Sequence, residues 1–213
     1  MGGSIMASII NASTTGVGGV ITTADNTGIL QLQTANVSAL QIDASQNITT
    51  TNKLNTASMP NGSVLQVVNS IITSKVTTTS SSFVSSGLSA SIIPKSVSNK
   101  ILIMVAGQTS IGTNGLDRVY FLIAGMTSSN QGDAGSGGTR CTSVVNPRSS
   151  DAGWAQSAID IKIIDSPNTT SSVTYTLQWK TNSGYTAALG SAVNNDSTVG
   201  NTPTTMTLME IAG

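Results

Sequence analysis

Near the start of the chain, short runs of alternating apolar and polar residues recur at a ten-residue step. Leu30 and Leu32 alternate with glutamines, and Leu40 and Ile42 repeat the pattern ten residues later. A weaker copy occupies residues 20–22. A period of two predicts strands with one apolar and one polar face. Strands this short cannot bury their apolar faces alone, so we expect other copies of the chain to complete the core of this segment.

Composition excludes several classes of protein. Nine basic residues balance nine acidic ones, and only 8% of the 213 residues are charged. A nucleic-acid-binding protein would carry a basic surplus, so we expect no nucleic-acid partner. No apolar run approaches the roughly 18–20 residues that span a bilayer, so we expect no membrane insertion. Short blocks rich in Val, Ile and Thr favour strands over disorder.

The sequence predicts three parts. Residues 1–19 are rich in Gly, Ser and Thr and read as an N-terminal arm that docks on a partner. Residues 20–59 hold the ten-residue repeat and a neck. Residues 60–213 form a head domain, because Pro60-Asn61-Gly62 is a strong turn signal at its start.

The head shows about eight strand-like blocks without a helical period. Residues 101–105 are apolar throughout, as expected of a central strand covered on both faces. Residues 159–163 alternate cleanly, and alternation in 173–180 places Trp179 in the core. We therefore predict an all-β chain: a short β-structured stem that other copies of the chain complete, followed by an antiparallel, jelly-roll-like β-sandwich head.

Catalytic signals are sparse, and we expect no enzyme. The chain has no histidine and one cysteine, Cys141, so we expect no Ser-His-Asp arrangement, no metal site and no cofactor. The catalytic alternative is a polysaccharide depolymerase, which needs two carboxylates across a sugar cleft. Glu210 is the only glutamate and lies in the last predicted strand, while Asp133 and Asp151 lie in the longest predicted loop.

Adhesion to a surface glycan or protein needs fewer specialised groups. Aromatic faces stack on sugars, and the guanidinium fork of Arg hydrogen-bonds hydroxyls or phosphates. Two long loops are predicted over residues 127–155 and 182–205, and the candidate receptor-contact residues in them are Trp154, Arg140, Arg148 and Tyr185. The structural alternative for Trp154 is that it anchors its loop to the core.

Several segments resemble the tail-fibre and appendage proteins of bacteriophages. Residues 39–48 are similar to the repeated element of such shafts, and residues 61–68 to the opening of a common C-terminal domain. Residues 89–103 and 207–211 resemble its next signature and its closing strand. The resemblance implies a homotrimer, with an N-terminal end attached to the particle, a β-structured stem, and a distal head that meets the host.

A threefold arrangement suits the alternating runs. Three copies of Leu30, Leu32, Leu40 and Ile42 can face a common axis as the trimer stem core, while the glutamines stay hydrated. We therefore expect a structural protein located in the virion, on the phage tail or particle surface, with other virion proteins bound through the arm. The alternatives are a capsid-decoration or collar protein with a purely architectural role and, as a third possibility, the depolymerase.

Overall fold

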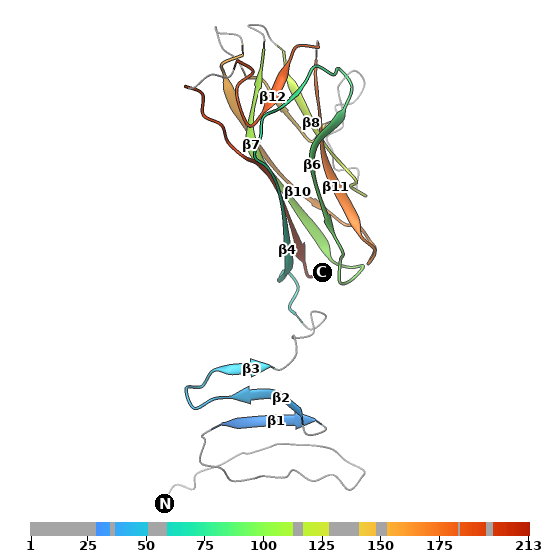
Figure 1. Cartoon of the computed structure of the whole chain (residues 1–213). Helices are drawn as coiled ribbons and strands as arrows, with labels where there is room; N and C mark the ends of the chain where they lie inside the picture. Colours follow the sequence, from blue (N-terminus) through green and yellow to red (C-terminus); the bar gives the residue numbers. More distant parts are fainter. Residues whose placement is uncertain are drawn as a thin grey trace, which may run out of the picture. The chain divides into compact units, whose positions relative to one another are not determined.

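The computed structural model describes residues 29–34, 37–50, 59–112, 117–127, 141–147, 153–182, 184–194 and 198–213. All regular secondary structure in these ranges is β, which confirms the predicted all-β class. The chain divides into two compact units, Met1–Leu54 and Asn55–Gly213 (Figure 1). The predicted arm, residues 1–19, and the weak repeat at 20–22 lie outside the described residues, and the three-part division stays a prediction.

The first unit contains one three-stranded antiparallel sheet, here called the stem sheet. Its strands are β1 (Leu30–Thr34), β2 (Val37–Ile42) and β3 (Ile48–Thr50), with β2 in the centre. Strands β1 and β2 are the predicted alternating runs. The ten-residue step between them is the spacing of a tight antiparallel hairpin, in which Leu32 lies opposite Leu40.

Two antiparallel sheets make up the second unit. The first, here called the β7 sheet, has β4 (Val64–Ile72), β13 (Thr204–Ile211), β7 (Lys100–Ile111) and β10 (Gln156–Asp165) side by side. Two short strands, β12 (Ala187–Leu189) and β5 (Val76–Thr78), complete this sheet. Strand β12 pairs with the last residues of β7, and β5 pairs with β12. The second, here called the β11 sheet, has the order β6 (Val84–Ile92), β11 (Val173–Thr181), β8 (Val119–Ala124) and β9 (Ser143–Val145).

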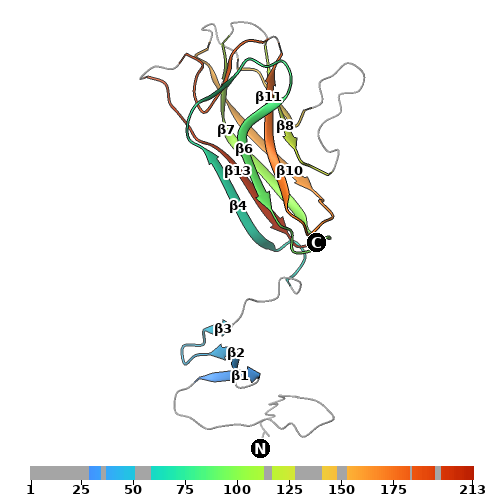
Figure 2. The ribbon, with the colours of Figure 1, turned by 45° about the vertical axis from the view of Figure 1, so that its right-hand side comes forward.

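The pairing of these strands is nested. Strand β4 pairs with β13, β6 with β11, β7 with β10, and β8 with β9, and successive pairs alternate between the two sheets. A long hairpin folded over itself into two four-stranded layers gives this order, which is that of a jelly roll. The predicted jelly-roll-like sandwich is confirmed, and Figure 2 shows both layers.

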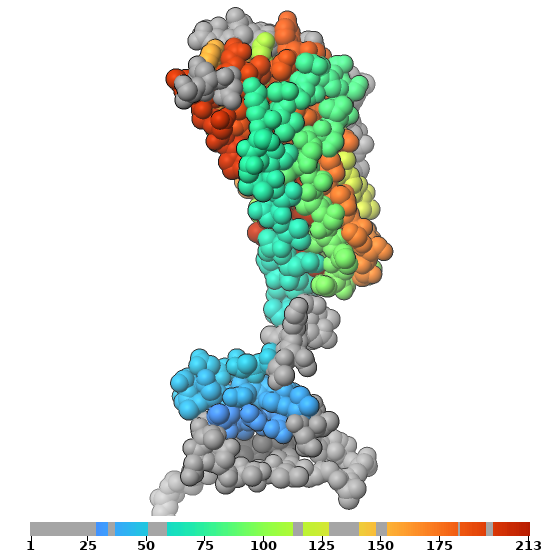
Figure 3. Space-filling view, viewed as in Figure 1, coloured from blue at the N-terminus to red at the C-terminus, as the bar shows by residue number. Residues whose placement is uncertain are grey.

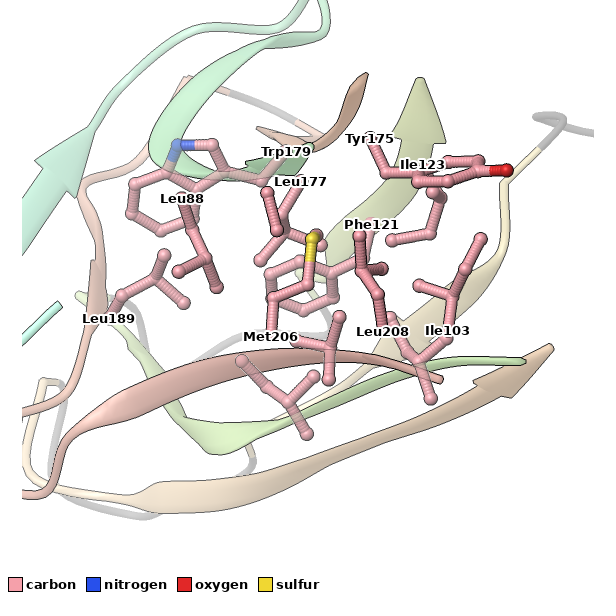
Figure 4. Close-up of a cluster of buried hydrophobic side chains, with 14 of the residues drawn as sticks. Leu88, Ile103, Phe121, Ile123, Tyr175, Leu177, Trp179, Leu189, Met206 and Leu208 are labelled. Carbon is pink, nitrogen blue, oxygen red and sulfur yellow. The ribbon is translucent and has the colours of Figure 1, made fainter. Parts of the chain in front are cut away.

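The core lies between the two sheets of the head. Tyr175, Leu177 and Trp179 of β11 are buried and face Met206 and Leu208 of β13 across the sandwich (Figure 4). The expected core position of Trp179 is confirmed, since 1% of it is exposed. In the space-filling view, β4 and β6 run side by side along one long edge of the sandwich and close it there (Figure 3).

Two strands lie where the sequence suggests only loops. Strand β9 falls within the predicted loop 127–155, and β12 within the predicted loop 182–205. Each has three residues, which is too short for a readable alternation. They form because a longer neighbour supplies a paired edge: β8 for β9, and β7 for β12.

The predicted turn at the start of the head is present. The backbone N–H of Ser63 donates to the carbonyl of Pro60 at 3.0 Å, and Gly62 has a φ of 90°. A β-turn with a positive φ at its third residue favours glycine, which explains the Pro60-Asn61-Gly62 sequence. The turn delivers the chain directly into β4.

Candidate functional site

The four residues predicted for the stem core lie on one face of the β1–β2 hairpin. Leu30 pairs with Ile42, and Leu32 pairs with Leu40. Directly opposed residues in an antiparallel pair point to the same side of the sheet, so the two pairs form a continuous apolar face. Strand β3 extends it, because Ile48 pairs with Ile42.

This apolar face has no cover within the described part of the first unit. Exposed fractions are 53% for Leu30, 45% for Leu32 and 68% for Ile48. Full burial of a Leu or Ile side chain contributes about 1.5–3 kcal/mol, so each of these residues has roughly 1 kcal/mol still to gain. A second apolar surface against this face would therefore stabilise the stem sheet.

The opposite face of the stem sheet is polar and internally hydrogen-bonded. The side-chain amide of Gln31 donates to Gln41 at 3.2 Å, and that of Gln33 donates to Gln31 at 2.9 Å. These three glutamines are partly or fully exposed and form a ladder across β1 and β2. Alternation also places Val37, 56% exposed, on this side of β2. The face that carries Leu30, Leu32 and Ile48 is therefore the more apolar of the two.

Asp43 fixes the turn between β2 and β3. Its carboxylate accepts the backbone N–H groups of Ser45 and Asn47, both at 2.9 Å, and the Asn47 side-chain amide at 3.0 Å. The Asn47 side-chain hydrogen bond, followed by the backbone bonds, lowers the pKa of Asp43 below its ordinary value. The turn sets the register in which Ile48 joins the apolar face.

In the head, Trp154 lies in a turn held against the end of β7. The backbone N–H of Gly153 donates to the Ile111 carbonyl at 3.2 Å, and the N–H of Asn194 donates to the Gly153 carbonyl at 3.0 Å. The turn is thus fixed by backbone bonds on two sides, while 41% of the Trp154 side chain remains exposed. A largely buried anchor would not leave this much of the indole in solvent.

Tyr185 lies next to the same end of β7. The backbone N–H of Gly112 donates to the carbonyl of Thr186 at 2.8 Å, and Tyr185 is 49% exposed. Ile111 and Gly112 are consecutive, so the segments that carry the two aromatic residues flank one strand end. The structure thus places two exposed aromatic side chains at the end of the sandwich away from Pro60 and the C-terminus. Arg140 and Arg148, the other two candidates, lie outside the described residues.

The only glutamate, Glu210, links neighbouring strands of the head through buried hydrogen bonds. Glu210 is fully buried, and its carboxylate accepts the Lys95 backbone N–H at 2.5 Å, the Asn99 side-chain amide at 2.6 Å and the Gln66 side-chain amide at 2.5 Å. These bonds tie β13 to β4 and to the segment that joins β6 to β7. Sequence reasoning missed this cluster, because its partners lie more than 100 residues from Glu210 and no local pattern links them.

Asp165 is a second buried carboxylate, and it too binds neighbouring protein groups. It accepts the Tyr175 hydroxyl at 2.8 Å and the Thr127 backbone N–H at 3.1 Å. Burial, reinforced by the hydrogen bond and the charge of Asp165, raises the pKa of Tyr175 well above its ordinary value. Asp133 and Asp151, the loop carboxylates considered for sugar cleavage, lie outside the described residues.

Neither a metal-binding cluster nor an activated thiol is found in the part of the chain that the structure describes. No group of three or more His, Cys, Asp or Glu residues there could hold a metal ion. Cys141 is half-buried, and burial raises the pKa of its thiol despite the opposing charge of Lys180. Within the same ranges, no helix is long and apolar enough to cross a bilayer.

One shallow depression lies at the end of the head where the chain enters. Lys95, Asn99 and Gly213 are among the residues that line it, and its volume is about 120 Å³. Pockets for small organic ligands usually measure about 300–1,000 Å³. The exposed aromatic pair therefore offers a better contact surface than this depression.

Comparisons with known proteins leave the family open. No known protein family matches the chain, and no curated protein matches it. Among solved structures, it is similar to the VP2 protein of infectious bursal disease virus in a subviral particle, at 10% identity and a TM-score of 0.27. The match covers 87% of this chain and 47% of that chain, so this chain spans about half the length of VP2. Agreement at this level supports no functional argument.

Proposed function

We propose that this chain is a structural virion protein, a homotrimeric bacteriophage tail fibre whose C-terminal head adheres to the host surface. The observation that carries the proposal is the apolar face of the stem sheet, formed by Leu30, Leu32, Leu40, Ile42 and Ile48, of which Leu30, Leu32 and Ile48 have no cover from the described residues of the first unit. Two further copies of the same face around an axis supply the missing cover. The resemblance of residues 39–48 to phage fibre shafts supports the same assembly.

The head supports adhesion rather than catalysis. Its jelly roll is a rigid scaffold, and such scaffolds present binding residues at the ends of their strands. Trp154 and Tyr185 are exposed at one such end. The chain has no histidine, and Glu210 and Asp165 are buried among protein donors. We assign the head a binding role, with a host glycan or protein as partner, and residues 1–19 the attachment to other virion proteins.

The trimer is tested by substitutions on the two faces of the stem sheet. Leu32→Asn with Leu40→Asn removes two apolar side chains per chain; the partner's cover is worth about 1 kcal/mol at Leu32, which is 45% exposed, and less at Leu40, which is already half-buried. Gln31→Ser with Gln41→Ser is the matched control on the polar face. Light scattering after size-exclusion chromatography should report a trimer for the wild type and control, and smaller species for the leucine variant. Equal masses for all three would reject the stem as the assembly element.

Adhesion is tested at the exposed aromatic pair. Trp154→Ala and Tyr185→Ala should each lower binding to host cells about 2- to 12-fold if they stack on the receptor, since one stacking contact contributes about 0.5–1.5 kcal/mol beyond its buried area. Tyr120→Ala is the control, because Tyr120 is an aromatic residue on the outer side of β8. Unchanged binding by both variants would remove this end of the head from the receptor surface.

A further inference from the structure

The outward side of the β7 sheet is unusually apolar. The register aligns Val67, Met209, Leu102 and Ile164 in one row across β4, β13, β7 and β10. Their neighbours along the core side, such as Ile101 and Ile103, are buried between the sheets, so this row points away from the core. We call it, with the neighbouring apolar positions, the apolar outer face; its members are Leu65, Val67, Ile71, Leu102, Met104, Ile164 and Met209. The same registers place polar Asn69, Thr205 and Thr207 beside this row.

The edges of this face are open to solvent. Val67 is 55% exposed, Ile71 54% and Ile164 49%. The central members Leu102, Met104 and Met209 are half-buried, and their cover comes from neighbouring side chains on the same face. A row of four large apolar side chains across four adjacent strands is a contiguous patch, which on a soluble protein marks an interaction surface.

The β11 sheet provides an internal comparison. Its outward positions include Ser89, Ser91, Thr174, Thr176 and Gln178, with Tyr120, Leu122 and Val144 as apolar or aromatic exceptions on β8 and β9. Both sheets cover the same core, so core packing does not account for the difference between their outer faces. Water suits the Ser- and Thr-rich face, whereas the apolar outer face gains free energy only if something covers it.

Charge on the apolar outer face is low. Asp160 and Lys162 lie on its β10 margin and form an ion pair with each other at 2.7 Å. Lys100, which is exposed and lies opposite Ile211, adds one positive charge at one end of the face. A strongly charged partner would find little complementary charge there. A copy of the same face meets a like charge only at the Lys100 end, so the pattern permits self-association.

The area of the face favours copies that are already tethered. Four strands about 4.8 Å apart and seven residues rising about 3.3 Å each cover roughly 440 Å². Free partners of standard affinity bury about 800 Å² per side, nearly twice as much. The chain enters β4, an edge of this sheet, through residues 51–63 that follow the stem strands. Joined stems would hold three heads at an effective concentration in the millimolar range, at which a small apolar contact suffices.

We infer that the apolar outer face is the surface by which three heads of this protein pack against one another, turned inward around the trimer axis. The inference rests on the proposed trimeric function and adds to it the contact made by the head. The polar face of the β11 sheet then faces outward. The Trp154 and Tyr185 end remains free for a receptor, because neither residue belongs to the apolar outer face.

Two methionines report on this packing without any substitution. Met104 and Met209 lie on the apolar outer face, whereas Met206 is fully buried in the core. Hydrogen peroxide converts accessible methionines to sulfoxides, which peptide mass spectrometry locates. The experiment first measures the native mass of the full chain and then the oxidation rate at each site. In a trimer, we expect Met104 and Met209 to react within about threefold of Met206.

Substitutions sharpen the test. Val67→Glu and Ile164→Glu place a charge at positions that the single chain leaves about half exposed, so each variant head should still fold. We expect oxidation of Met104 and Met209 to accelerate more than tenfold, with Met206 unchanged as the marker of an intact core. Ser89→Glu, on the edge strand of the other sheet, is the matched control and should change nothing.

The outcomes separate the two claims. A trimer whose Met104 and Met209 react more than tenfold faster than Met206 overturns the head contact and leaves the proposed fibre standing. A native mass of one chain overturns the trimeric function itself. If a glutamate variant also exposes Met206, its head has unfolded, and the wild-type rates alone decide.

Discussion

Glu210 provides the sharpest prediction on the stability of the head. Its carboxylate accepts three N–H donors at 2.5–2.6 Å, and 0% of the residue is exposed. Glu210→Gln keeps the shape but replaces one acceptor oxygen by an NH₂ group that must face a donor. Rotating the Gln66 amide does not relieve this clash, because the same NH₂ also donates to the Ile93 carbonyl at 2.7 Å.

The magnitude follows from these contacts. A hydrogen bond to a charged group contributes about 1.5–3 kcal/mol, and a buried donor left unpaired costs a further 1–3 kcal/mol or so. Because the surrounding side chains can rearrange in part, we expect Glu210→Gln to lower the free energy of unfolding by about 3 kcal/mol. For a domain of 150–250 residues, this corresponds to a fall in Tm of about 6–12 °C.

The assay is urea unfolding of the full chain at a fixed protein concentration, followed by the fluorescence of buried Trp179. The control is Asp160→Asn, which also neutralises a carboxylate. Both partners of the Asp160–Lys162 pair are more than 60% exposed, so we expect a change of at most about 1 kcal/mol. A Glu210→Gln midpoint no lower than that of the control would refute the assigned role of the Glu210 cluster.

Three further predictions concern particular residues of the two units. The raised pKa of Tyr175 means that its neutral hydroxyl stabilises the fold below the unfolded pKa of about 10, and that this stability is lost as pH rises above 10. Urea midpoints measured between pH 9 and 11 should therefore fall less steeply for Tyr175→Phe than for the wild type. Gly125 has a φ of 93°, and a Cβ there would clash with the Thr174 carbonyl oxygen, so Gly125→Ala should lower the free energy of unfolding by more than about 2 kcal/mol. Gly62 has a similar φ but nothing within 4 Å of its Cβ position, so Gly62→Ala should lower it by about 1 kcal/mol. Equal losses in the two variants would contradict the clash. The lowered pKa of Asp43 adds stability above its unfolded value of about 3.9 that is lost as pH falls through the folded pKa; the NMR signal of the Asn47 side-chain amide should follow this titration, and a flat response would contradict it.

Strand positions could be predicted wherever side chains alternate over enough residues. In β10 and β11, period two placed Ile159, Ile161 and Trp179 in the core, as the structure shows. The same rule predicted strands at Leu30–Leu32 and at Leu40–Ile42, but not that the two runs pair with each other as a hairpin. The short strands β9 and β12 could not be predicted, because three residues show no period and these strands form only beside a partner strand that is distant in sequence.

The proposed contact surfaces were harder to predict from the sequence. Residues 101–105 were predicted to form a strand covered on both faces, but Leu102 and Met104 are only half-buried in the single chain. The apolar composition of β7 is therefore the sequence signal for the partner surface that we propose. It could not be located from sequence, because Val67, Met209 and Ile164 reach the same row only through the jelly-roll pairing.

Hydrogen exchange of the backbone amides in β1, β2 and β3 tests the central claim most directly. In the native assembly, we expect these amides to be protected. When dilution or mild urea separates the chains, protection of residues 30–50 should vanish while the core strands β7 and β11 stay protected, because an uncovered three-stranded sheet of this size is only marginally stable. A single-chain species, shown by its mass of 21.6 kDa, whose stem amides remain protected would contradict the claim.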